Sequence, residues 1–348
     1  MSNKKLILVS IIVAIVISSG TFALFYEQSS KPVPQETEKL NNAYSIIEYK
    51  LPQNNTSPLF PLYDKDHNVI WLGDTKANSS RIWEFDLDSK KFIEHKLAGI
   101  NIVSKISLGP AGTIWYIDPF TKLLGNYNPA SNTNELIKIP TNGTIADLAA
   151  DQKSVWIIVS DLDKILKYDI QSENFTTSSI PTAHGSPIAI TIDNTGYLWI
   201  VEAIGKILRI DPSSLQMLEF SPQENLTLKL PVAIKSDPNT GDIYVAEHGE
   251  DAVFAFYTQN DSFKRLPLYP DHDALPFGMT FDMHGNLWVA EHTINKIAVL
   301  DPRTGQSTEV EIPSTNPLTQ WLTSDSKGNV WLAEPGGSAL GVINNTGK

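Results

Sequence analysis

The sequence contains no cysteine among its 348 residues. Disulfide bonds, thiol catalysis and cysteine-ligated zinc are therefore excluded, and cysteine usage says nothing about the redox compartment. Other chemical motifs are also missing, because there is no glycine-rich phosphate loop, no H-E-x-x-H metal helix and no G-x-S-x-G nucleophile elbow. No segment after residue 27 keeps a helical apolar period for long enough to build a helical solenoid.

Basic residues are scarce as well, with 27 Lys and Arg against 39 Asp and Glu. Lys4 and Lys5 lie in an N-terminal stretch without acids, so the rest of the chain carries 25 basic and 39 acidic groups, a net charge of −14. Such a body repels phosphate backbones and anionic lipid surfaces. We therefore expect no nucleic-acid partner and favour cations or positively charged ligands.

The N-terminus has the organisation of an export signal. Residues 1–5 are short and basic, and residues 6–26 contain no charge. The uncharged stretch is long enough to span a hydrocarbon core of roughly 30 Å, although its first half, followed by Ser18, Ser19 and Gly20, also fits a signal-peptide core. Both alternatives place the body outside, because the positive end stays in the cytoplasm.

We favour a single-pass anchor retained in the cell membrane over secretion after cleavage, because no clean A-x-A site is present. Residues 27–42 are polar, contain two prolines and predict a flexible linker. Eight N-x-S/T sequons agree with an exported body that could be a glycoprotein. They begin at Asn54, Asn55, Asn78, Asn142, Asn174, Asn225, Asn260 and Asn344.

An internal repeat is the strongest signal in the sequence. An aromatic residue that follows a turn and an aliphatic residue recurs at intervals of 41 to 45 residues. Its positions are Trp71, Trp115, Trp156, Trp199, Tyr244, Trp288 and Trp331. Around Trp288 the repeat contains four short strand patterns, at residues 276–282, 287–291, 297–302 and 307–313, separated by turn residues. Four strands in about 43 residues are typical of one propeller blade.

The ends of the repeat predict how the ring closes. After Trp331 the chain has a third strand and then stops, without a fourth. An additional strand pattern, Ile46 to Pro52, precedes the first repeat and resembles the fourth strands of other repeats. We therefore predict that residues 43–348 form an all-β, monomeric propeller of seven four-stranded antiparallel blades. The N-terminal strand would complete the last blade as its outer strand, preceded by the transmembrane or signal helix.

An acidic residue lies three positions after the aromatic in six of the seven repeats. The column reads Asp74, Asp118, Val159, Glu202, Glu247, Glu291 and Glu334. In a propeller this position lies near the face where pockets usually open, called here the pocket face. The carboxylates could accept backbone N–H bonds from turns. Alternatively, several could converge on a divalent cation such as Mg²⁺ or Ca²⁺, or remain metal-free with raised pKa values.

Histidines accompany this column. His248 follows Glu247, and His292 follows Glu291, at equivalent positions of neighbouring repeats. His184 and His272 lie in connections between blades, so we place them on the pocket face too. We place the other three elsewhere: His67 and His284 in turns on the opposite face, and His95 in an outer strand.

The repeat, with its LWVAE, KI, LDP and TG elements in residues 287–305, resembles the streptogramin B lyase (virginiamycin B lyase) family. Related NHL-type and gluconolactonase-type propellers share parts of it, and the resemblance covers roughly residues 43–346. It implies a magnesium-assisted elimination that opens a cyclic depsipeptide ester, with a histidine as general base and nearby acids holding the metal.

The sequence departs from the family pattern at the expected bases. The family's histidines lie in a P-H-x-I motif about eleven residues before the aromatic of the last blades, and a further family acid is matched here by Pro335. The matching column contains no histidine and reads Phe60, Ser104, Ile145, Ile188, Val232, Phe277 and Gln320. Without a base there, proton transfer would lose a factor of about 10² to 10⁴.

Three functions follow from these residues. The first is a surface-displayed module that binds a small molecule, peptide, glycan or envelope protein, with Glu202, Phe277, Gln320 and His272 as ligand-binding candidates. The second is a metal-assisted lyase or hydrolase. It would use His292 or His248 as a relocated base and Glu247, Glu291 and Glu334 as metal ligands. The third is a structural spacer.

Overall fold

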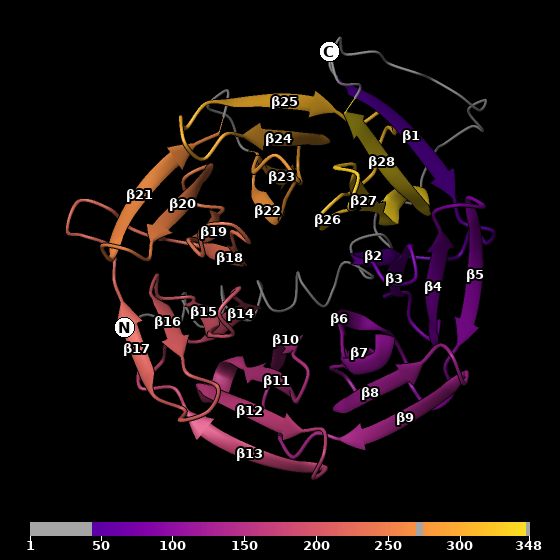
Figure 1. The fold of residues 1–348 in the computed structure, drawn as a ribbon, viewed down its shortest axis with the longest axis horizontal. Helices are drawn as coiled ribbons and strands as arrows, with labels where there is room; N and C mark the ends of the chain where they lie inside the picture. Colours follow the sequence, from indigo (N-terminus) through magenta and orange to yellow (C-terminus); the bar gives the residue numbers. More distant parts are fainter. Residues whose placement is uncertain (1–43, 269–273, 346–348) are drawn as a thin grey trace.

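The computed structural model describes residues 44–268 and 274–345, which form seven four-stranded antiparallel sheets around a central axis (Figure 1). The predicted seven-bladed propeller is therefore confirmed. The basic start, the uncharged segment, the linker and His272 lie outside the described residues. Within the described ranges, no helix has the length and apolar character needed to cross a bilayer.

Every blade has the same order of strands from the axis outward. The inner strands are β2 (Pro58–Asp64), β6 (Ser104–Leu108), β10 (Ile145–Ala150), β14 (Pro187–Ile192), β18 (Pro231–Ser236), β22 (Pro276–Phe281) and β26 (Leu322–Ser324). The second strands are β3 (Val69–Asp74), β7 (Ile114–Asp118), β11 (Ser154–Val159), β15 (Leu198–Glu202), β19 (Ile243–Glu247), β23 (Leu287–Glu291) and β27 (Val330–Glu334).

A third and an outer strand complete each blade. The third strands are β4 (Arg81–Asp86), β8 (Leu123–Asn128), β12 (Lys164–Asp169), β16 (Ile207–Ile210), β20 (Ala252–Tyr257), β24 (Lys296–Leu300) and β28 (Ala339–Asn345). The outer strands are β5 (Lys91–Lys96), β9 (Thr133–Lys138), β13 (Asn174–Ser179), β17 (Met217–Phe220), β21 (Ser262–Pro267), β25 (Ser307–Glu311) and β1 (Tyr44–Lys50). Among the described residues, three single 3₁₀ turns join strands: η2 (Pro110–Gly112), η3 (Ser160–Leu162) and η4 (Pro335–Gly337).

The aromatic residues that mark the repeat are buried in the core, and all seven expose 2% or less of their surface. In five blades the indole N–H donates to an aspartate between the inner and second strands, at N–O distances of 2.8 to 3.5 Å. The pairs are Trp71–Asp64, Trp156–Asp151, Trp199–Asp193, Trp288–Asp282 and Trp331–Asp325. The same carboxylate holds the turn: Asp282 also accepts the backbone N–H groups of His284 and Asn286, each at 2.9 Å.

The second blade lacks this bond because a glycine replaces the aspartate. Gly109 stands where the aspartate would be, and a Cβ there would lie 2.3 Å from Nε1 of Trp115. The Trp115 indole nitrogen has no hydrogen-bond partner. The tryptophan–aspartate bond is therefore a repeated device that one blade replaces by close packing.

We expect Asp282→Ala to lower the free energy of unfolding by about 2 to 4 kcal/mol. The substitution leaves a buried indole N–H and two turn N–H groups without an acceptor. Urea unfolding of the variant measures this, with Asp301→Ala at an exposed turn of the same blade as control. A loss no larger than that of the control would contradict the assigned role.

The ring closes by pairing the first strand with the third strand of the last blade. β1 pairs antiparallel with β28 from Tyr44 opposite Asn345 to Lys50 opposite Ala339, and Figure 1 shows these strands side by side. The strand predicted at residues 46–52 is confirmed, two residues earlier at both ends. Because β1 runs toward the pocket face, Tyr44 lies on the opposite face.

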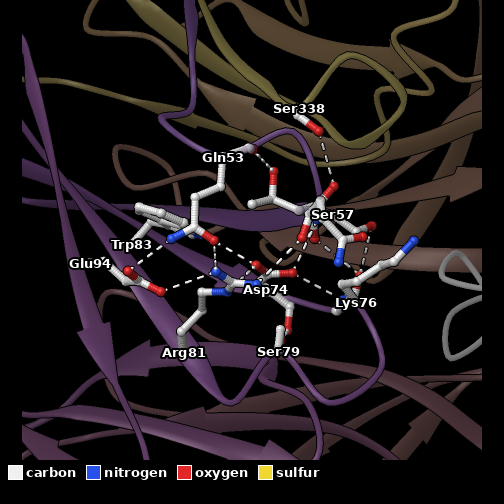
Figure 2. Close-up of polar contacts among 12 residues, drawn as sticks. Gln53, Ser57, Asp74, Lys76, Ser79, Arg81, Trp83, Glu94 and Ser338 are labelled. Carbon is white, nitrogen blue, oxygen red and sulfur yellow. Dashed lines mark hydrogen bonds and ion pairs between the residues drawn. The ribbon is translucent and has the colours of Figure 1, made fainter.

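A polar clasp fixes the segment that connects β1 to the first blade (Figure 2). It consists of Gln53, Asp74, Arg81 and Glu94. Arg81 forms ion pairs with Asp74 and Glu94, both at 3.0 Å, and its guanidinium also donates to the side-chain oxygen of Gln53. Gln53 in turn donates to Glu94 at 3.0 Å, and Asp74 accepts the backbone N–H of Ser57 at 3.1 Å. The clasp therefore positions the start of the first blade against the end of β1.

We expect Arg81→Met to destabilise the fold by about 3 to 5 kcal/mol, because Asp74 and Glu94 would keep partly buried charges without their counterion. The Arg81 side chain is 10% exposed, whereas that of Arg303, which pairs with Asp301, is 78% exposed. Arg303→Met is therefore the matched control, with an expected change of about 1 kcal/mol or less. Thermal and urea unfolding measure both, and equal losses would show that the clasp adds nothing.

Candidate functional site

The inner strands change their pairing at the pocket face. In six blades the register between the inner and second strands shifts near the start of the inner strand, which marks a β-bulge. A bulge leaves residues unpaired and redirects their side chains. Phe60, Lys105 and Phe277 all lie within such shifts, and Phe60 and Lys105 have positive φ angles of 53° and 49°.

The bulged residues belong to one group of side chains, which we call the central cluster: Phe60, Lys105, Asp147, His248, Phe277, His292 and Trp321. The ring of Trp321 lies 5.2 Å from that of Phe60 and 5.3 Å from that of Phe277, centroid to centroid. The ring of Phe277 also lies 5.3 Å from that of His248 and 6.1 Å from that of His292. Five aromatic rings from blades one, five, six and seven are thereby connected.

Lys105 ties this aromatic group to the third blade. Its ammonium lies 3.6 Å from the ring centre of Trp321, 4.8 Å from that of Phe60 and 3.4 Å from Oδ1 of Asp147. Burial lowers the pKa of Lys105 and raises that of Asp147, while the attraction between the two opposes both shifts. Lys105 was not predicted as a site residue, although the sequence contains a signal for it. The corresponding place holds Pro61, Ala146, Ala189, Ala233 and Gly278 in five blades, but Lys105 and Trp321 in the others.

The two histidines that follow the acidic column both reach the central cluster, as their equivalent positions suggested. Burial, reinforced by neighbouring His292, lowers the pKa of His248 to about 4. Burial also lowers the pKa of His292, against a backbone hydrogen bond at Thr319. Both imidazoles are therefore neutral at pH 7. Each keeps one buried nitrogen without a partner, Nε2 of His248 and Nδ1 of His292.

Further buried polar atoms without partners lie beside them on the segment before β26. They are Oγ1 of Thr319, Oε1 of Gln320 and Nε1 of Trp321. Native proteins satisfy nearly all buried polar groups, so a local concentration of unpaired donors and acceptors marks a place for a bound molecule. Phe277 and Gln320, both predicted as ligand-binding, are thus placed in or next to the cluster, whereas Glu202 lies in the fourth blade.

Three members of the acidic column accept hydrogen bonds from the backbone. Asp74 accepts from Ser57 and Lys76, and Asp118 accepts from Asn101, Phe120 and Thr121. Glu247 accepts three N–H groups, from Lys229, Leu230 and Gly249, at 2.6 to 3.1 Å. For these residues the first alternative, hydrogen bonds from backbone N–H groups, is confirmed. Each carboxylate joins the end of its second strand to the preceding connection.

The other three glutamates are buried without such bonds. Glu202, Glu291 and Glu334 expose 1% or less of their surface, and their carboxylate oxygens accept no backbone N–H. Burial raises the pKa of Glu202 to about 7 and the pKa values of Glu291 and Glu334 to about 8. Of the third alternative, these residues show the raised pKa values.

The predicted metal set is not brought together. In residues 44–268 and 274–345, no three His, Asp or Glu side chains are placed to share a metal ion. Glu247, Glu291 and Glu334 end the second strands of three separate blades, and Glu247 is already bound to backbone N–H groups. These residues therefore do not fit a shared magnesium or calcium ion, and no chemical step is assigned to one.

Two shallow hollows lie at the rim of the first two blades, away from the predicted site. One, of about 450 Å³, is lined by His95 and Tyr127, and the other, of about 380 Å³, by Arg81 and Ser80. His95 lies in outer strand β5 as predicted, where it bonds Glu84 and the hydroxyl of Tyr127, each at 2.7 Å. These contacts join the first and second blades.

We expect stability to fall between pH 6.5 and pH about 8.5, and to fall less in Glu291→Gln. Glu291 has a folded pKa of about 8 against an ordinary 4.5, so its stabilising effect is complete below pH 4.5 and is lost as pH rises through about 8. The lowered pKa of His248 makes stability rise with pH instead, but only below its ordinary pKa of 6.5. Melting temperatures at both pH values measure the difference.

Glu247→Gln is the control for this pH prediction. It replaces a carboxyl that accepts three N–H groups, so it should lower stability by about 2 kcal/mol or more at both pH values. An unchanged pH dependence in Glu291→Gln would show that this carboxyl does not change its charge in the window.

No family model and no curated protein matches the sequence. A streptogramin B lyase structure matches 87% of this chain and 98% of its own, with a TM-score of 0.77 and 19% identity. Another similar structure is virginiamycin B lyase from Staphylococcus aureus, solved as a catalytically inactive histidine-to-alanine variant with quinupristin. The match covers 86% of this chain and 99% of that one, with a TM-score of 0.75 and 19% identity.

The predicted family resemblance is confirmed for the fold. Another similar structure is the extracellular domain of a hybrid two-component system from B. thetaiotaomicron, with a TM-score of 0.67 and 15% identity. It covers 85% of this chain and 39% of that one. Propellers of this architecture therefore occur both as enzymes and as extracellular domains of larger proteins.

Proposed function

We propose that the chain is an exported, membrane-held binding module that takes a small peptide-like ligand over the central cluster. The observation that carries this proposal is the coincidence of five aromatic rings with unpaired buried donors and acceptors in one place. Aromatic surface with a few polar groups is the usual lining of a ligand site. The neutral nitrogens of His248 and His292 and the indole N–H of Trp321 suit a ligand that carries amides and hydroxyls.

The direction of the chain supports display away from a membrane. Tyr44, where the described chain begins, lies on the face opposite the central cluster. An anchor at residues 6–26 would therefore join the propeller from the far side and leave the pocket face accessible. The similar extracellular domain agrees with an extracytoplasmic position.

Quinupristin is a suitable probe, because the structurally similar lyase has been captured with it. We expect the purified full-length chain to bind it, and Trp321→Ala and Phe277→Ala to weaken binding at least about tenfold, since each removes a ring from the cluster. Calorimetry or tryptophan fluorescence measures the affinity, with melting temperatures checking that the variants fold.

Met283→Ala is the control, because Met283 is 61% exposed on a turn of the opposite face. It should bind quinupristin like the wild type. Absence of wild-type binding at about 1 mM, or equal binding by both cluster variants, would overturn the proposal.

A lyase or hydrolase with a relocated histidine base is the second candidate. It is supported by the neutral imidazoles of His248 and His292, each with a free nitrogen in the cluster. The pKa of about 4 at His248 makes this group a weak proton acceptor at neutral pH, so binding remains the favoured function.

Mass spectrometry of quinupristin incubated with the protein separates the two candidates. Elimination would open the ester ring without a change of mass, whereas hydrolysis would add one water. His292→Ala and His248→Ala should lower either activity by about 10² to 10⁴ if the histidine is the base. Incubations with magnesium and with EDTA test the metal requirement. Intact quinupristin in every incubation would exclude this candidate.

A further inference from the structure

Hydroxyl groups link neighbouring inner strands in the half of these strands away from the pocket face. Oγ of Ser107 in β6 accepts the backbone N–H of Ala150 in β10 at 3.0 Å. Oγ1 of Thr323 in β26 accepts the backbone N–H of Tyr63 in β2 at 3.3 Å. Ser107 and Thr323 hold the same place in the repeat, because each lies opposite the recurring aromatic of its blade. One inner-strand side chain can therefore satisfy an N–H group of the next blade.

Lys235 of β18 holds this place in the fifth blade, because it lies opposite Tyr244. Residues directly opposite each other in an antiparallel pair have their side chains on the same face of the sheet. The ring of Tyr244 packs against that of Phe281 in β22, with 5.2 Å between the ring centroids. Lys235 therefore lies on the face of the fifth blade that meets the sixth, and an ammonium replaces the hydroxyl.

The backbone of β22 offers a second donor at the same place. Phe281 matches Ala150 and Tyr63, since each comes one residue after the position opposite the aromatic. The next residue, Asp282, donates its N–H to Asn286 within the sixth blade at 3.0 Å. Because successive N–H groups of a strand point in opposite directions, the N–H of Phe281 points away from β23, toward the fifth blade. An ammonium cannot accept it.

The ammonium of Lys235 has no counter-charge in the part of the chain that the structure describes. Burial alone lowers the pKa of Lys235, with no opposing attraction from a carboxylate. An unpaired ammonium that is shielded from water is costly unless an acceptor approaches it. The place between β18 and β22 therefore has two donors and lacks an acceptor.

Solvent reaches this level of the inner strands from the face opposite the pocket face. Lys235 is half-buried, and the matching residues Ser107, Thr191 and Thr323 are also partly exposed. By contrast, the first residue of every inner strand, at the pocket face, is buried. A small ion can therefore reach Lys235 without passing the central cluster.

We propose that Lys235 binds a small monovalent anion of the chloride type between β18 and β22. The ammonium supplies the charge and the N–H of Phe281 a second hydrogen bond. The anion would thereby take the part that hydroxyl oxygens take between other blades. Because the equivalent place in the second and seventh blades is filled by one hydroxyl group, a single small ion fits better than phosphate. One negative charge also balances one ammonium. This site is separate from the proposed ligand site and does not depend on it.

The experiment compares sodium chloride with sodium gluconate at equal ionic strength, so that general screening is the same. It uses the full-length chain in detergent at pH about 7, where a lysine ammonium is ordinarily charged. Chloride and bromide should each raise the melting temperature by about 1 to 4 °C over gluconate, because an ion bound only by the folded state stabilises it. Equal melting temperatures in the three salts would overturn the proposal.

Variants of Lys235 place the ion. Lys235→Met should abolish the shift and melt no lower than the wild type in gluconate, because it removes an uncompensated charge. Lys235→Thr restores the hydroxyl of other blades, so it should be stable without chloride and insensitive to it. Lys264→Met, at an exposed position of β21 in the same blade, should keep the full shift. A shift that survives in both Lys235 variants would contradict the assignment, whatever quinupristin binding shows.

Discussion

The pairing of β1 with β28 is the constraint on which the rest of the molecule depends. Each blade can bury its faces only against two neighbours, so the last blade needs the first. Seven backbone positions separated by nearly the whole chain form this contact, from Tyr44 to Lys50. The clasp around Arg81 lies beside it. A polar network therefore accompanies the closure.

The acidic column shows that one position of a repeat can have two different environments. Asp74, Asp118 and Glu247 meet backbone N–H groups of the preceding connection, which offset part of the cost of their burial. Glu291 and Glu334 occupy the same place but meet no backbone N–H, and burial raises their pKa values. The connection before the inner strand therefore supplies N–H donors in some blades and not in others.

The central cluster shows that a shared fold need not bring the same side chains to the pocket face. The blades resemble those of a streptogramin B lyase, yet the positions expected to carry histidines hold Phe277 and Gln320. The histidines of this chain approach the same region from turns after the second strands, and burial keeps them neutral. Shared architecture therefore shows the fold alone, and a function has to be argued from the side chains.

The sequence by itself determined the blades, because their signals are local. Turn residues, alternating strands and a recurring aromatic can be read within one repeat, and Ile46 to Pro52 matches a missing fourth strand. Only the tertiary structure decided the site. The bulge that turns Lys105 toward Trp321, the space that Gly341 leaves for Glu334, and the neutral state of His248 depend on residues from other strands and blades. Such contacts arise from how blades pack together, and no pattern within one repeat contains that information.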